Sequence, residues 1–266
     1  MRLIRRHPSE KIRVPPVSGV TPRSPIRWLA LGWADFRKAG IPSLLHGVIV
    51  AAVSVAIVTI TLLYWQLLPG AITGFVLTGP FLATGLYALS ERLERGKSAT
   101  IQDAMNAWKH SSRCLFGFGV LLVLAATAWV IFSVLMFRYF INVTIDNPVD
   151  FLRYVLTQNE LTFTLWTILG ALGTALAFSI TVVSLPLLME RDVNTKLAIR
   201  TSIRAVGRNP VTMVWWAMII MFITGLSFIT GMLGFIILYP VLGHASWHVY
   251  RDMVDASELP MRPQVE

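Results

Sequence analysis

The sequence predicts an all-α integral membrane protein, a polytopic bundle of six transmembrane helices with amphipathic helices at the membrane surface. Of the 266 residues, 55% are hydrophobic and 14% are charged, whereas soluble domains have about 25% charged residues. Two stretches, 39–90 and 210–250, contain no Asp, Glu, Lys or Arg and are too long for one crossing, which takes about 20 residues. Pro69 and Gly70 divide the first stretch, and Gly231 divides the second. Each stretch therefore predicts two spans joined by a short turn.

The first part of the chain begins with a basic segment. Residues 1–25 carry six Lys or Arg side chains and five prolines, a composition that predicts a flexible cytoplasmic tail. Residues 26–38 place apolar side chains at helical intervals, with cations elsewhere on the helical wheel, and predict a helix along the membrane surface. Spans are then expected at about 42–65 and 71–90.

The middle part repeats this order. Thr100 and Asp103 form the pattern of a capping box, which predicts the start of a second amphipathic helix. The uncharged run 114–137 is long enough to cross the membrane once, and residues 161–189 are expected to cross back. The loop between these two spans is too short to form a domain.

The last part contains the sharpest charge pattern. Lys196, Arg200, Arg204 and Arg208 follow one another at intervals of four residues, so on a helix they form a basic stripe along one side. Such a stripe fits contact with anionic lipid headgroups, and a solvated cytoplasmic face is the alternative interpretation. The remaining elements are two spans and a short cytoplasmic tail, expected at 210–230, 232–250 and 253–266.

The distribution of cations predicts the orientation. The segments expected on one side of the membrane hold 21 of the 23 Lys and Arg residues, and only Arg138 and Arg153 lie in the loop expected on the other side. By the positive-inside rule, both termini are expected in the cytoplasm. Because the positive charges lie at the membrane edges, the net charge of +9 is not read as a sign of nucleic-acid binding.

Each pair of spans follows an amphipathic helix, which predicts an imperfect threefold repeat of hairpins. The units comprise residues 26–90, 98–189 and 194–250. A shift of 160 residues aligns Gly74 with Gly234, and the same shift aligns the prolines of the two spans. Prolines within a span free a backbone carbonyl and mark specific packing or a kink. The candidate packing or kink positions are Gly74, Pro80, Pro186, Gly234 and Pro240.

Four runs of the sequence are typical of a known family. They are GPFLATGLYALSERLERG at 79–96, LPLLMERDV at 185–193 with TSIRAVGRNP at 201–210, and PVLGHASWHVYRD at 240–252. These runs resemble the bacterial integral membrane proteins grouped as domain-of-unknown-function family 2189. The resemblance implies a multi-helix protein of the bacterial inner membrane. It implies no activity, substrate or catalytic residue.

Three histidines are the weak candidates for a metal or haem site: His46, His244 and His248. His244 and His248 lie one helical turn apart, near the cytoplasmic end of a predicted span. Asp252 is the only acid within four residues of any of the three histidines, and it is expected to face water. A ligating imidazole is usually oriented by a partner such as a carboxylate. We therefore expect no metal and no cofactor, and a role of these rings in interfacial anchoring or helix–helix hydrogen bonds.

The absence of charges within the spans and the absence of catalytic motifs leave two classes of function. No Asp, Glu, Lys or Arg side chain lies well inside a predicted span, which disfavours a proton-coupled mechanism. The sequence contains no P-loop, nucleophile elbow, HExxH or dinucleotide-binding motif, so we do not expect an enzyme. A non-catalytic scaffold or accessory subunit, which contacts lipids and other membrane proteins, is the favoured interpretation. The alternative is a channel or permease for a small neutral or apolar molecule, with proline-broken spans along its path.

Overall fold

A computed structural model describes residues 14–64, 67–109, 112–140, 150, 153 and 161–262 of the chain. In this part of the chain the regular elements are α-helices, so the predicted all-α class is confirmed. The helices are α1 (Ser24–Ala39), α2 (Ile41–Leu63), α3 (Leu68–Leu82), α4 (Thr84–Glu94), α5 (Ile101–Lys109), α6 (Arg113–Phe140), α8 (Leu161–Thr181), α9 (Ser184–Glu190), α10 (Thr195–Arg208), α11 (Pro210–Ile229) and α12 (Phe235–Met253).

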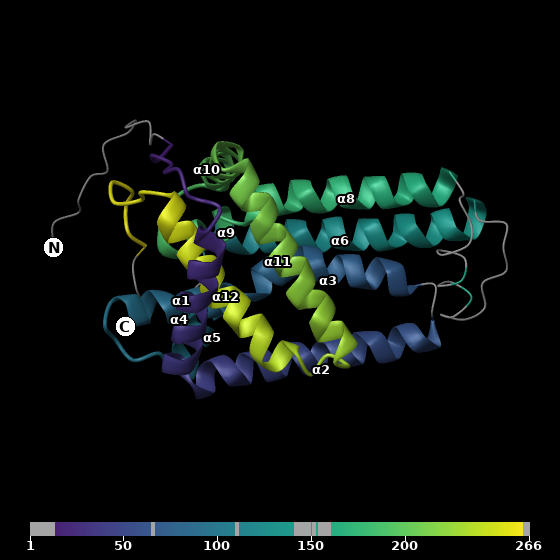
Figure 1. The fold of residues 1–266 in the computed structure, drawn as a ribbon, viewed down its shortest axis with the longest axis horizontal. Helices are drawn as coiled ribbons and strands as arrows, with labels where there is room; N and C mark the ends of the chain where they lie inside the picture. The colour runs from purple at the N-terminus through teal and green to yellow at the C-terminus, as the bar shows by residue number, and fades with distance from the viewer. Residues whose placement is uncertain are drawn as a thin grey trace.

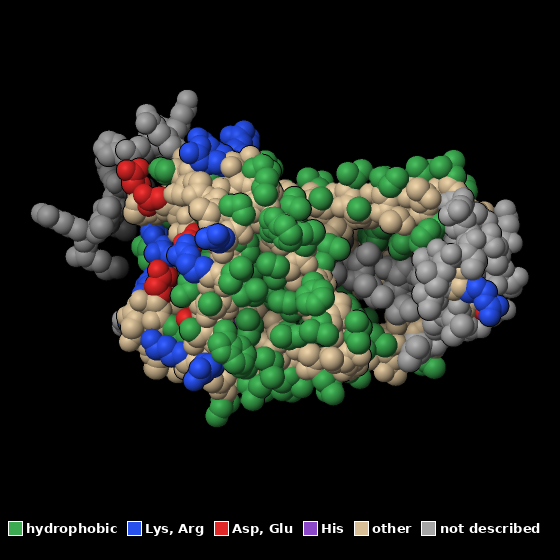
Figure 2. Space-filling view, in the orientation of Figure 1, with side chains coloured by type: hydrophobic (Ala, Val, Ile, Leu, Met, Phe, Trp, Pro, Cys, Tyr) green, Lys and Arg blue, Asp and Glu red, His purple; other side chains and the backbone are tan. Residues whose placement is uncertain are grey.

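The helices differ in direction, as Figure 1 shows. Helices α2, α3, α6 and α8 lie along the long axis of the molecule, and α11 and α12 cross them diagonally. Helices α1, α4, α5, α9 and α10 gather at one end, together with the last residues of α12. In Figure 2 most of the visible Lys, Arg, Asp and Glu side chains lie at this end, which we call the charged end.

Local sequence sets the ends of several helices. Pro25, Pro42 and Pro210 each lie in the first turn of a helix, where a missing N–H costs no helical hydrogen bond. Gly40, with a φ of 63°, separates α1 from α2 in a backbone conformation that favours glycine. The side chain of Asn194 accepts a hydrogen bond from a backbone N–H and caps α10. Helices α1, α5 and α10 correspond to the three predicted amphipathic helices.

Four helical segments of the described chain are long and apolar enough to cross a membrane. They comprise Ile41–Thr61, Arg113–Phe140, Leu161–Glu190 and Pro210–Ile229. These segments coincide with the first, third, fourth and fifth predicted spans. The predicted number of six is not confirmed, because the second and sixth predicted spans are not among these four segments.

The second predicted span, 71–90, consists of parts of two helices. Helix α3 has 15 residues, about 22 Å at 1.5 Å per residue, which is shorter than a bilayer core of roughly 30 Å. It contains Pro80 and ends at Leu82, and α4 begins at Thr84. Proline lacks the N–H of a helix interior, and the hydroxyl of Tyr87 donates to the carbonyl oxygen of Pro80 at 3.2 Å. The break is thus stabilised by a side chain of α4.

The five candidate packing or kink positions occupy different settings. Pro80 precedes a break between helices, Pro186 lies in the first turn of α9, and Pro240 lies within an uninterrupted α12. At Gly74 a Cβ atom would lie 3.6 Å from side chains of α6. At Gly234, the N-cap of α12, a Cβ atom would lie 2.8 Å from the backbone of α11. Because equivalent prolines have different roles, the threefold repeat is not confirmed.

The core contains large aromatic side chains close to the charged end. Trp28, Trp216, Trp247 and Tyr250 are among the largest fully buried residues. The rings of Trp28 and Trp216 meet edge to face, with centroids 5.7 Å apart, a geometry worth about 0.5–1.5 kcal/mol beyond the buried area. This contact joins the surface helix α1 to the apolar helix α11.

The N-terminal segment is more ordered than its composition predicted. Residues 14–25 were expected in a flexible tail, but the backbone N–H of Ser18 donates to the carbonyl oxygen of Met253 at 2.9 Å. The backbone N–H of Val20 donates to the side chain of Asn209 at 2.8 Å. These partners lie far away in the sequence, so the composition of the segment does not predict the contacts. Residues 14–25 therefore belong to the folded part of the chain and not to a flexible tail.

The C-terminal segment requires the same correction. Residues 254–262 pack on the charged end, although 253–266 was predicted as a short tail. Arg191 forms an isolated β-bridge with Met261, and the backbone N–H of Asp192 donates to the carbonyl oxygen of Pro260 at 2.9 Å. The two ends of the described chain therefore belong to one folded unit with the helices.

Candidate functional site

Helix α12 is the centre of the charged end, with α1, α2 and α4 packed against it. A Cβ atom at Gly32 of α1 would lie 2.6 Å from the carbonyl oxygen of Val241. A Cβ atom at Gly47 of α2 would lie 2.1 Å from the carbonyl oxygen of Ile236. A side chain does not fit either contact, so the two glycines allow α1 and α2 to approach α12 closely. Polar side chains from several helices can then meet.

His244 of α12 lies at this meeting point and is fully buried. Its Nε2 atom is 2.7 Å from the Oγ atom of Ser43 in α2. Its Nδ1 atom is 2.7 Å from the Oγ atom of Ser90 in α4. Both serines are also fully buried. The imidazole therefore connects three helices through its two ring nitrogens.

Asp35 of α1 extends this chain of hydrogen bonds. The hydroxyl of Ser90 donates to Oδ2 of Asp35 at 2.7 Å, and Nε2 of His248 lies 2.9 Å from the same oxygen. Helices α1, α2, α4 and α12 are thus joined by one polar chain. We call the five residues Ser43, His244, Ser90, Asp35 and His248 the His244 network.

The donors and acceptors determine the protonation of the network. Ser90 has one hydroxyl proton and donates it to Asp35, so its oxygen accepts a hydrogen bond from Nδ1 of His244. The neutral imidazole then carries its proton on Nδ1, and Nε2 accepts a hydrogen bond from Ser43. Asp35 accepts from both Ser90 and His248. Every polar side chain in the network has a partner in this arrangement without a ligand.

The environment of Asp35 favours its charged form. Burial raises the pKa of this carboxyl, but hydrogen bonds from His248 and Ser90, together with the nearby histidine charge, lower it. The hydrogen bonds and charge prevail, and the pKa of Asp35 lies below its ordinary value of 3.8. Asp35 is therefore an anion at neutral pH.

The sequence predicted only part of this cluster. His244 and His248 do lie close together, but the carboxylate beside them is Asp35, 213 residues before His248. Asp252 is not the water-facing acid that was expected. It accepts a hydrogen bond from Nε1 of Trp28 at 2.5 Å and pairs with an arginine of α1. The acid closest to His248 in the sequence thus binds α1 and does not contact the histidine network.

A signal for Asp35 is present in the amphipathic helix. Trp28, Gly32 and Ala39 are buried in α1, and Asp35 falls at the helical spacing that places it on the same face. An acid on the apolar face of a surface helix is unusual, because a buried charge needs a partner. This pattern predicts a buried partner for Asp35 without identifying it.

His46 takes part in different contacts. Its Nε2 atom lies 3.0 Å from the carbonyl oxygen of Leu82, and its ring stacks on Tyr239 with centroids 6.1 Å apart. The three candidate histidines are therefore engaged with protein groups. Among the residues that the structure describes, no three His, Cys, Asp or Glu side chains are arranged to hold a metal ion.

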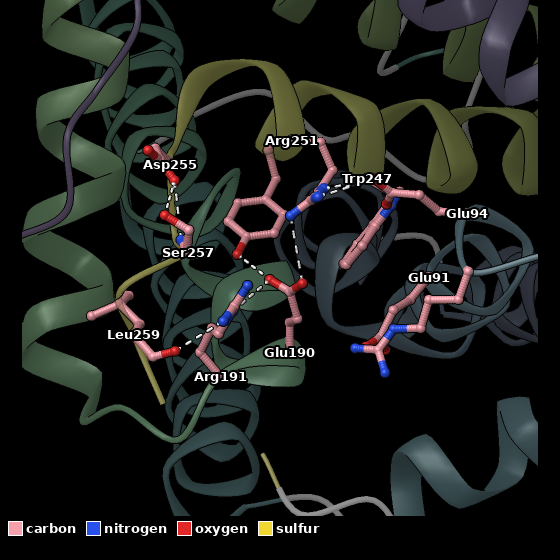
Figure 3. A network of polar contacts seen from close by, with 11 residues as sticks. Glu91, Glu94, Glu190, Arg191, Trp247, Arg251, Asp255, Ser257 and Leu259 are labelled. Carbon is pink, nitrogen blue, oxygen red and sulfur yellow. Dashed lines mark hydrogen bonds and ion pairs between the residues drawn. The ribbon is translucent and has the colours of Figure 1, made fainter. Parts of the chain in front are cut away.

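A second polar cluster lies where α9 meets the end of α12, as Figure 3 shows. The buried carboxylate of Glu190 accepts a hydrogen bond from the hydroxyl of Tyr250 and another from Nε of Arg191, at 3.1 Å. Nη1 of Arg251 lies 3.5 Å from the other oxygen of Glu190. Two arginines and a phenol thus stabilise one buried negative charge.

The Glu190 cluster extends to α4 and to the C-terminal segment. Arg251 also pairs with Glu94 of α4 at 3.0 Å, and Nε1 of Trp247 donates to Glu94 at 2.9 Å. Burial lowers the pKa of Arg251, but the charges of Glu94 and Glu190 raise it above its ordinary value. Nη1 of Arg191 donates to the carbonyl oxygen of Leu259 at 2.8 Å. The cluster therefore connects α4, α9, α12 and the last described residues.

The basic stripe lies apart from both clusters. Lys196, Arg200, Arg204 and Arg208 are all exposed on α10, as the spacing predicted. The structure thus brings together two of the three candidate histidines and leaves the four cations on a separate surface.

Residues 67–190 match the model of a family described as predicted integral membrane protein (DUF2189). The match covers slightly less than half of the chain. It supplies Ser90 to the His244 network and supplies Glu94 and Glu190 to the second cluster, while the partners on α1, α2 and α12 lie outside the DUF2189 match. No curated protein and no solved structure matches the chain.

Proposed function

We propose that the protein is a six-span protein of the cell inner membrane that acts as a non-catalytic scaffold or accessory subunit of a membrane complex. The His244 network is the observation that carries this proposal. Its buried polar groups bind one another across four helices, and such a satisfied network rigidifies a helical bundle. The hydrogen bonds of the network therefore help to hold α1, α2, α4 and α12 in their observed arrangement.

The directions of the helices support six crossings. Helices α2 and α6 both begin at the charged end and run away from it, and α3 runs back between them (Figure 1). Helix α8 likewise returns from the far end of α6, and α12 returns from the far end of α11. Each outward apolar helix is thus followed by a segment that leads back to the charged end.

The positions of the cations support the orientation. Arg113 and Arg138 lie near opposite ends of α6, 25 residues or about 38 Å apart along the helix. The cations concentrated at the charged end favour the cytoplasm for that end, by the positive-inside rule. Both ends of the described chain lie on this side, which supports cytoplasmic termini.

Hydroxyl groups within the bundle bind backbone carbonyl oxygens three or four residues before them. Thr78, Thr84, Ser179 and Thr181 donate to the carbonyl oxygens of Gly74, Phe81, Ala175 and Ala177, at distances of 3.0, 2.7, 2.8 and 2.6 Å. In a channel or permease these hydroxyls would be candidates to line a path. Their local hydrogen bonds favour a packing role in a scaffold over contact with a solute.

The lateral surface supports contact with lipids and other membrane proteins. Large apolar side chains of α2, α6, α8 and α11 are exposed, as Figure 2 shows for one face of the molecule. Phe222 is 73% exposed and Leu176 is 63% exposed. An apolar surface of this extent needs a hydrocarbon environment or a partner.

The proposal is tested by purifying the tagged protein from native membranes in mild detergent and identifying its partners by mass spectrometry. We expect at least one other membrane protein in constant ratio to the chain. His244→Gln, which can form both hydrogen bonds of the imidazole, is expected to retain that ratio, and His244→Ala to reduce it. Purification of the protein without any partner, together with solute flux in proteoliposomes, would support a permease instead.

A further inference from the structure

Helix α10 lies across the end of α8 and presents two different sides. In Figure 1 it is seen end-on, so its axis crosses the direction of α6 and α8. Leu197, Ala198, Thr201, Ser202 and Ala205 are buried against the protein. The four cations of the stripe are exposed on the remaining surface. Helix α10 is thus an amphipathic helix whose apolar side is already occupied by the chain itself.

Hydrogen bonds in the middle of α10 and just after its last turn hold it in this rotation. The hydroxyl of Ser202 donates to the carbonyl oxygen of Ser179 at 2.7 Å and accepts from the backbone N–H of Val183 at 3.2 Å. After the last turn, the side-chain amide of Asn209 donates to the carbonyl oxygen of Ser18 at 3.0 Å. Because these contacts prevent the helix from turning about its axis, its cations stay directed away from the bundle.

The neighbouring elements place α10 at the edge of the apolar region. Arg208 lies two residues before Pro210, where the apolar segment Pro210–Ile229 begins. Ser202 binds Ser179 in the last turn of α8 and Val183 just after it, at the end of α8 that faces the charged end. Helix α10 therefore lies at the level where apolar helices give way to charged residues, which is the depth of lipid headgroups in a bilayer.

The charges of the stripe remain available. Among the described residues, none of its four cations forms an ion pair with an acid, in contrast to Arg191 and Arg251. The nearest acid in the sequence, Asp192, interacts electrostatically with Arg262. Ile203, 48% exposed between two of the cations, adds an apolar side chain to the same surface. The surface thus combines uncompensated positive charge with apolar contact area.

We propose that the exposed face of α10, formed by Lys196, Arg200, Arg204 and Arg208, binds the headgroups of anionic phospholipids in the leaflet at the charged end. Each cation close to an anionic membrane surface contributes roughly fivefold to affinity. Because the face is preformed, binding does not require a helix to fold. The surface would fix the depth of the bundle in the membrane.

The test compares lipid binding to the purified, delipidated full chain by native mass spectrometry, with phosphatidylglycerol and phosphatidylethanolamine as probes. We expect the protein to prefer phosphatidylglycerol. Changing all four cations to Gln is expected to lower its affinity for this lipid by about a hundredfold or more, with little change for phosphatidylethanolamine. Changing the three arginines to Lys keeps the charge and is expected to retain the preference.

A second variant with the same loss of charge serves as the control. It changes Arg37, Lys38, Lys97 and Lys109, which are also exposed cations, to Gln. Equal losses in the two fourfold variants, or unchanged binding in the α10 variant, would overturn the proposal and leave a solvated face. If the α10 variant unfolds, Arg204→Gln decides the question, because it is expected to lower phosphatidylglycerol affinity roughly fivefold, and no change would overturn the proposal.

Discussion

The Nε2 atom of His248 lies 2.9 Å from Oδ2 of Asp35, although the two residues are 213 positions apart in the chain. The contact joins the last helix to the first, and the same carboxylate also accepts a hydrogen bond from Ser90. Asp35 is therefore the point where α1, α4 and α12 are held together. Loss of its charge affects three helices at once.

Asp35→Asn keeps the size of the side chain but removes its negative charge. We expect the free energy of unfolding to fall by about 1–3 kcal/mol, the usual cost of disturbing a buried hydrogen bond to a charged group. Denaturant unfolding in mild detergent measures this change. The control is Asp255→Asn, at an exposed acid of the charged end that binds Ser257. Equal losses in the two variants would contradict a central role for Asp35.

The pKa of Asp35 also predicts how stability depends on pH. Because the pKa of the folded state lies below 3.8, the stability contributed by the charge is present above the unfolded value and is lost as pH falls through the folded value. The difference in unfolding free energy between the native chain and Asp35→Asn should therefore shrink below about pH 4. Unfolding curves at several pH values measure it. A difference that grows toward low pH would refute the assigned direction of the pKa shift.

Substitutions of His244 separate hydrogen bonding from other roles of the imidazole. His244→Gln retains a donor and an acceptor for Ser90 and Ser43, so we expect a folded protein that loses about 1 kcal/mol or less. His244→Ala leaves a cavity and removes the imidazole partner of Ser43, while Ser90 keeps its bond to Asp35, with an expected loss of about 2–4 kcal/mol. Unfolding midpoints and elution profiles distinguish the two. If Gln were as damaging as Ala, the imidazole would have a function beyond these hydrogen bonds.

The proposed orientation predicts the labelling of introduced cysteines in intact cells. Cys114 is the only cysteine of the chain, so Cys114→Ser provides a background without reactive thiols. Asp146→Cys, at a position outside the described residues, should react with an impermeant reagent added from outside. Lys97→Cys should react only after the membrane is permeabilised. Labelling of Lys97→Cys in intact cells would exclude cytoplasmic placement of the charged end.

The order of the residues was enough to predict the all-α membrane class and the position of most of the helices. Long uncharged runs predicted the apolar helices α2, α6, α8 and α11, because an uncharged run of sufficient length is a property of consecutive residues. Helical spacing predicted α1 and α10 for the same reason. The second predicted span is instead the pair α3 and α4, and composition could not show the break because the residues around Pro80 are apolar.

The pairing of the polar groups depends on how the helices pack, and the sequence did not predict it. Asp252, four residues from His248, was the nearest carboxylate in the sequence, yet the histidine binds Asp35 and Asp252 binds Trp28. Composition likewise predicted a tail where Ser18 bonds to Met253. Periodicity assigns a residue to a face of its own helix, whereas a hydrogen bond between helices depends on their packing direction and closest approach. At the charged end that approach is set by Gly32 and Gly47 against the backbone of α12, a contact between surfaces that no single stretch of sequence contains.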